Sequence, residues 1–131
     1  MTDDEFLDAF TTCSLLPQQF NHRAHVRVAW LMLRRYPVDQ AIARTCEGIA
    51  RLAAHFGAAD KFNRTLSEAL VRLMARACES SRDASFDEFL GANKWLLGDV
   101  RGALAEYYSP ALLYSVDAKQ QFLAPDLKPL P

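Results

Sequence analysis

The stretch FNHRAHVRVAWLMLRRY, residues 20–36, decides the fold class. Its apolar residues recur at intervals of three and four, which is typical of an α-helix. Asn21 stands where an N-cap is expected, and Pro37 follows at the point where the pattern ends. The apolar residues of the segment cover more than one face of the expected helix. The segment therefore predicts a helix over 22–35 that is buried centrally or lies at a subunit contact.

Helical periodicity continues along the chain, and no alternating run requires a strand. Thr2 with Glu5 and Ser85 with Glu88 have the spacing of capping boxes, and Asp60 is a candidate cap for the helix after it. We expect helices over 3–12, 38–56, 61–79, 86–97 and 99–107, and short helical turns after Ser109 and Ser115. The end, APDLKPLP, is too rich in proline for a helix. The fold class predicted is an all-α bundle of five or six helices with an extended Pro-rich C-terminal tail.

Length and composition favour one soluble domain. The chain has 131 residues, which predicts a single helical domain over 1–131. We expect its N-terminal helix within 1–15, core helices within 20–108, and short turns and the tail within 109–131. The net charge of -1 argues against nucleic acid and membrane surfaces as partners. The three cysteines form no CxxC pair, and neither a signal peptide nor a membrane span is visible, so we expect a cytoplasmic protein.

Charge is unevenly distributed between two segments. The first expected helix is acidic, with Asp3, Asp4, Glu5 and Asp8, and the helix over 22–35 is basic, with Arg23, Arg27, Arg34 and Arg35. The simplest interpretation is that the two segments neutralise each other in the fold. The alternative is a partner-binding patch around Trp30.

Three polar residues fall on apolar helix faces. At about 100° per residue, His22 and His25 share the apolar face of the helix over 22–35, and Asn63 shares that of the helix over 61–79. Burying a polar group without a partner costs about 1–3 kcal/mol, so we expect these side chains to be satisfied inside a pocket. Tyr36 falls on the same face as the two histidines, and Ser67 lies at the edge of the face that holds Asn63.

Three interpretations of these residues stay open. Histidines three apart can bind one ion, so His22, His25 and Asn63 could hold a divalent metal such as zinc or iron. The histidines could instead be structural, and Asn63 could serve the open N–H groups of its own helix. The third interpretation is a metal-free small-molecule pocket with a histidine as general base. Tyr107 and Tyr108, close to the two short turns, could line such a pocket or belong to the core.

Three motifs carry a resemblance: FNHRAHVRVAWL over 20–31, YYSPALLYS over 107–115 and PDLKPLP over 125–131. In combination the chain resembles, from about residue 18 on, a family of small bacterial all-helical proteins with no established activity. Members of that family often have Y-H-x-T where this chain has Phe62-Asn63-Arg64-Thr65. The resemblance implies a third inward histidine in relatives at position 63, and this chain departs from that pattern.

The function predicted is binding of a small-molecule ligand, or a small enzyme, at a His/His/Asn pocket, with or without a metal. His22 and His25 would act as base or metal ligand. The candidates for ligand binding are Asn63, Tyr36, Ser67, Tyr107 and Tyr108. The alternative is a non-catalytic helical interaction protein that forms a homodimer.

Overall fold

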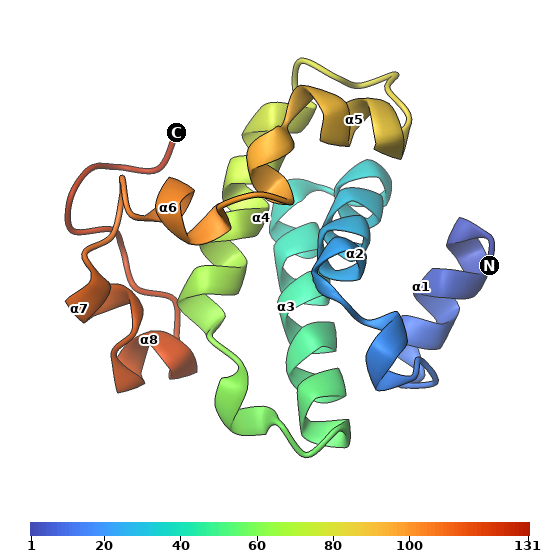
Figure 1. Cartoon of the computed structure of the whole chain (residues 1–131), viewed down its shortest axis with the longest axis horizontal. Coiled ribbons are helices and arrows are strands. Elements are labelled where there is room, and N and C mark those ends of the chain that lie inside the picture. The colour runs from blue at the N-terminus through green and yellow to red at the C-terminus, as the bar shows by residue number, and fades with distance from the viewer. The chain divides into compact units, whose positions relative to one another are not determined.

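The computed structural model describes all residues from 1 to 131, and its regular structure is entirely helical. Eight α-helices, α1 to α8, and three 3-10 helices, η1 to η3, follow one another along the chain (Figure 1). The all-α fold class is thereby confirmed, with more α-helices than the five or six expected. No helix is both long enough and apolar enough to cross a membrane.

The chain forms two compact units, Met1–Phe62 and Asn63–Pro131. The first contains α1 (Asp3–Thr11), η1 (Pro17–Gln19), α2 (His22–Arg35), α3 (Val38–His55) and η2 (Ala59–Lys61). The second contains α4 (Arg64–Cys78), α5 (Phe86–Ala92), η3 (Lys94–Leu96), α6 (Val100–Leu104), α7 (Pro110–Leu113) and α8 (Val116–Gln120). The single-domain organisation expected from chain length stays a prediction.

Local capping signals position the helices of the first unit. The Thr2 hydroxyl accepts a hydrogen bond from the Glu5 amide at 3.1 Å, and the Glu5 carboxylate accepts one from the Thr2 amide at 3.0 Å. This is the capping box expected for α1. The Asn21 side chain accepts from the Ala24 amide at 2.9 Å and caps α2, as expected. Gly57 follows the end of α3 and has φ +73°. This left-handed backbone conformation favours glycine.

Helices α2 and α3 lie side by side in the first unit (Figure 1), and α1 contacts α3. A β-carbon added at Gly48 of α3 would overlap two ring atoms of Phe10 on α1. Glycine therefore allows a close approach that no other residue would permit at this position. Val26 and Val28 of α2 are fully buried, in agreement with a helix that is apolar over more than one stripe.

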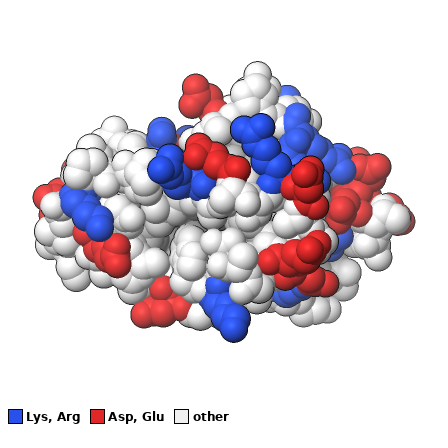
Figure 2. Space-filling view, turned by 90° about the horizontal axis from the view of Figure 1, so that it is seen from above, with Lys and Arg blue, Asp and Glu red and all other residues white.

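Ion pairs join the acidic α1 to the basic α2. Asp3 accepts a hydrogen bond from the Arg27 guanidinium at 2.7 Å, and Asp4 accepts one from Arg35 at 2.6 Å. The Arg27 guanidinium also lies 4.3 Å from the centre of the Phe6 ring. On the face drawn in Figure 2, blue side chains mostly lie beside red ones. The expected mutual neutralisation of the two segments is confirmed.

Three helix boundaries in the second unit differ from expectation. Residues 59–61 form η2, so Asp60 does not cap α4, and the cap is Asn63. The expected helix over 86–97 ends after α5 because the Asn93 side-chain amide donates to the Phe89 carbonyl at 2.9 Å, a local bond that competes with helix continuation. The expected helix over 99–107 is the shorter α6. The Ser85–Glu88 capping box of α5 is present as expected.

The second unit has an apolar cluster on α4, α6 and α7, together with Tyr108. Its buried members are Ala69, Leu73, Leu104, Tyr108 and Leu113. Trp95 and Tyr107 are partly buried and pack against it. These contacts hold the segments that follow α5 against one face of α4.

Residues 121–131, here called the C-terminal segment, contain no helix and are hydrogen-bonded to the rest of the second unit. The buried Thr65 hydroxyl donates to the Gln121 carbonyl at 2.8 Å and accepts from the Leu123 amide at 3.1 Å. The Ser109 hydroxyl and amide donate to the two carboxylate oxygens of Asp126 at 2.6 and 2.8 Å. The segment is thus fixed through both its backbone and its side chains.

Glu68 of α4 is a buried carboxylate between two arginines of the same helix. Arg64 donates two hydrogen bonds to Oε1, at 3.2 and 2.9 Å, and Arg72 donates two to Oε2, at 3.1 and 2.9 Å. The Glu68 side chain is 7 % exposed. Because both oxygens are saturated by guanidinium donors, the burial of this charge is compensated.

Candidate functional site

The two histidines of α2 differ in exposure. His22, the first residue of the helix, is exposed, and His25 is half-buried. The His25 ring stacks on Phe20 with 4.0 Å between centroids, and Phe20 stacks on Phe10 at 5.6 Å. The expectation that both imidazoles face inward is therefore wrong for His22. A helical wheel gives the direction of each side chain about the helix axis, but it does not give the solvent exposure of the first turn.

The environment of His25 keeps its ring neutral. Burial, and to a lesser extent the charge of His22, lowers the pKa of His25 from 6.5 to about 4. A group with this pKa is a weak base at neutral pH. No group of three or more His, Cys, Asp and Glu side chains is placed to hold a metal ion. Catalytic and metal-binding roles for His22 and His25 stay predictions.

Both ends of the Asn63 side chain are hydrogen-bonded within the second unit. The oxygen accepts from the Leu66 amide at 3.0 Å and caps α4, and the nitrogen donates to the Leu113 carbonyl at 2.8 Å. Asn63 thus joins the start of α4 to the end of α7. This arrangement matches the structural interpretation, in which Asn63 serves its own helix. Its role as a metal ligand stays a prediction.

The remaining predicted residues have varied surroundings. Tyr36 is half-buried beneath the Arg44 guanidinium, which lies 4.1 Å from its ring centre. Ser67 is half-buried on α4. Tyr108 is fully buried and donates to the Leu123 carbonyl at 2.7 Å, and burial raises its pKa to about 12. Tyr108 therefore acts as a core residue and as an anchor for the C-terminal segment.

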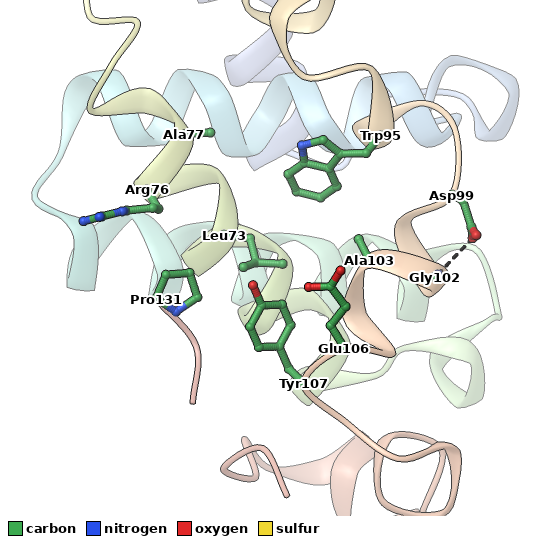
Figure 3. Close-up of a pocket in the computed structure, with 10 residues that line it drawn as sticks. All are labelled: Leu73, Arg76, Ala77, Trp95, Asp99, Gly102, Ala103, Glu106, Tyr107 and Pro131. Carbon is green, nitrogen blue, oxygen red and sulfur yellow. Dashed lines mark hydrogen bonds between the residues drawn. The ribbon is translucent and has the colours of Figure 1, made fainter. Parts of the chain in front are cut away.

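Tyr107 belongs to a cleft of about 550 Å³ in the second unit (Figure 3). The cleft is open to solvent and lies among the second half of α4, η3, α6 and the C-terminal segment. Its lining consists of Leu73, Arg76, Ala77, Trp95, Asp99, Gly102, Ala103, Glu106, Tyr107 and Pro131. In Figure 3 the Trp95 and Tyr107 rings extend into the cleft from opposite sides, and Leu73 lies between them in this view.

Charged groups stand at the rim of this cleft. Asp99 accepts from the Gly102 amide at 2.9 Å and caps α6. Arg76 points away from Trp95 in Figure 3 and pairs with Glu79 at 3.3 Å. The Glu106 carboxylate lies close to Tyr107 in the same view. The cleft therefore combines aromatic walls with two carboxylates and one guanidinium that already has a partner.

Glu106 and Tyr107 share a cation from the C-terminal segment. The Lys128 ammonium lies 3.4 Å from a Glu106 oxygen and 5.0 Å from the centre of the Tyr107 ring. The Leu127 amide also donates to the Tyr107 carbonyl at 2.9 Å. These contacts fix the backbone of Tyr107 beside the segment that carries Lys128.

Of the residues that line this cleft, Tyr107 was a candidate from the sequence, whereas Trp95 and Glu106 were not. Neither stands in a motif, and the cleft is assembled from segments that are distant in the chain. Comparisons with protein-family models, with curated proteins and with solved structures gave no match to this chain. The residues and their geometry therefore carry the functional argument alone.

Proposed function

We propose that this protein binds a small molecule in the cleft lined by Trp95 and Tyr107. The observation that carries the proposal is the pair of aromatic rings extending into the cleft from opposite sides (Figure 3). Ligand pockets typically have volumes of about 300–1,000 Å³ and combine aromatic walls with a few polar groups. The cleft, at about 550 Å³, has this size and composition.

The walls of the cleft are held in place before any ligand arrives. Trp95 and Tyr107 both pack on the apolar cluster of the second unit, and the backbone of Tyr107 is bonded to Leu127. An aromatic side chain that is already fixed loses little conformational entropy on binding. This preorganisation lowers the entropy cost of recognising a small ligand.

The proposal is for binding and assigns no reaction. Of the two carboxylates at the rim, Asp99 is engaged in capping α6 and Glu106 in pairing with Lys128. Neither is arranged with a second catalytic group. Catalysis by His22 or His25, and the homodimer alternative, stay predictions from the sequence.

The proposal can be tested by an NMR fragment screen of the ¹⁵N-labelled full chain, with cationic, neutral and anionic aromatic fragments. We expect at least one fragment class to shift the Trp95 indole and the Ala103 amide. The variant Ala103→Leu fills the cleft and should abolish the shifts. The matched control Ala105→Leu adds the same volume at an exposed position outside the lining and should retain them. If no fragment of any class shifts these resonances, the proposed function is wrong.

A further inference from the structure

We propose that the cleft selects organic cations, and in particular ligands with a quaternary ammonium group placed between Tyr107 and Glu106. This inference rests on the proposed function, since it names the ligand class of the same cleft. It starts from the Lys128 ammonium, which lies against both residues.

The Lys128 ammonium indicates that Tyr107 and Glu106 attract a positive charge. The ring and the carboxylate that contact Lys128 are both part of the lining. A cation over an aromatic face is attracted by the ring quadrupole, and a neighbouring carboxylate adds to that attraction. Lys128 is not itself part of the lining, but it contacts the two lining groups that we expect a ligand cation to contact. A ligand cation that reaches both groups would compete with it.

The other charges at the rim favour a cation as well. Arg76 is the one basic residue of the lining; it is directed away from Trp95 and paired with Glu79. Asp99 and Glu106 are both acidic. Lys128 already balances Glu106, so a ligand cation gains from this carboxylate where it takes the place of Lys128, whereas an anionic ligand would meet both carboxylates once Lys128 is displaced.

Trp95 is the reason we expect a quaternary rather than a primary ammonium group to bind. A quaternary group donates no N–H hydrogen bonds and is weakly hydrated, so it gains most from contact with aromatic faces. In Figure 3 the Trp95 ring faces the Tyr107 side of the cleft. Of the two rings, Lys128 lies over that of Tyr107, and we expect the broader trimethylammonium group to extend from there toward Trp95.

The test compares three probes of similar shape by following the Trp95 indole resonance in the full chain. The probes are choline, its neutral isostere 3,3-dimethyl-1-butanol, and the anion 3,3-dimethylbutanoate. We expect choline to bind with a dissociation constant in the millimolar range, roughly fivefold tighter than the alcohol, and the anion to bind weakest. Equal binding of choline and the alcohol would overturn the inference.

Two variants locate the cation. Glu106→Gln should weaken choline binding roughly threefold and leave binding of the alcohol unchanged. Lys128→Met should strengthen choline binding roughly two- to threefold because the internal competitor is gone, and Lys128→Arg should retain the wild-type affinity. Choline binding that is unaffected by both Glu106→Gln and Lys128→Met would show that the cation does not lie between Tyr107 and Glu106.

The screen and the titration fail in different ways. If neutral or anionic fragments bind the cleft and choline does not, the cation inference falls and the proposed function survives. If neither the fragments nor choline shifts the Trp95 indole, both fall.

Discussion

Replacing Asn63 by alanine should destabilise the second unit by about 2 kcal/mol. The substitution removes the cap of α4, for which the usual cost is about 1 kcal/mol. It also removes the bond from the side-chain nitrogen to the Leu113 carbonyl. A hydrogen bond of this kind contributes about 1 kcal/mol net, and the two losses are expected to add.

Urea denaturation of the full chain, followed by circular dichroism at 222 nm, measures this effect. With a urea dependence of about 2 kcal/mol/M, the midpoint should fall by about 1 M. Asn21→Ala is the matched control, because Asn21 is an exposed cap whose oxygen accepts from the Ala24 amide in the same way. That variant should lose only the cap, or about 1 kcal/mol.

The difference between the two variants isolates the bond to Leu113. If Asn63→Ala costs no more than Asn21→Ala, the bond to the Leu113 carbonyl contributes nothing to stability, and the stabilising link from α4 to α7 is refuted. Adding zinc to the wild type checks the alternative assignment. A midpoint that rises with zinc in the wild type and not in Asn63→Ala would indicate that Asn63 acts as a metal ligand.

Three further predictions concern individual buried groups. Thr65→Val should cost about 2 kcal/mol, because it leaves two backbone groups of the C-terminal segment unpaired, and hydrogen exchange at the Leu123 amide should accelerate. His25 has a folded pKa of about 4 against an ordinary 6.5, so its contribution to stability is complete above pH 6.5. This contribution, up to about 3 kcal/mol, is lost as the pH falls toward 4. The difference between the urea midpoints at pH 7 and pH 4.5 should therefore be smaller in His25→Phe than in the wild type. Glu68→Gln should cost about 2 kcal/mol in the same assay because two arginines lose a buried counter-charge, whereas the exposed Glu79→Gln should cost under about 0.5 kcal/mol.

Local signals in the sequence predicted the helices well where a cap decides the boundary. The boxes at Thr2 and Ser85 and the cap at Asn21 depend on atoms three residues apart, so spacing alone reveals them. The prediction that Asp60 caps α4 was wrong because residues with a similar capping preference stand at both 60 and 63. The chain uses Asn63, which also reaches Leu113 across the fold. Such a long-range bond has no signature in the local sequence.

The candidate cleft was far less predictable than the helices. Tyr107 was recognised as a pocket candidate, but Trp95 and Glu106 come together with it only through tertiary packing. No periodicity connects η3 with the turns after α6. The histidines drew attention because they are rare on apolar faces, yet wheel geometry could not show that the first turn of α2 leaves His22 exposed.

The contact between Gly48 and Phe10 makes two distant positions depend on each other in evolution. Since a methyl group at position 48 would collide with the ring at position 10, a larger residue at one site requires a smaller one at the other. In divergent homologues we expect the two columns of an alignment to vary together. That covariation would help to locate α1 and α3 in homologous sequences that are too different to be aligned by residue identity.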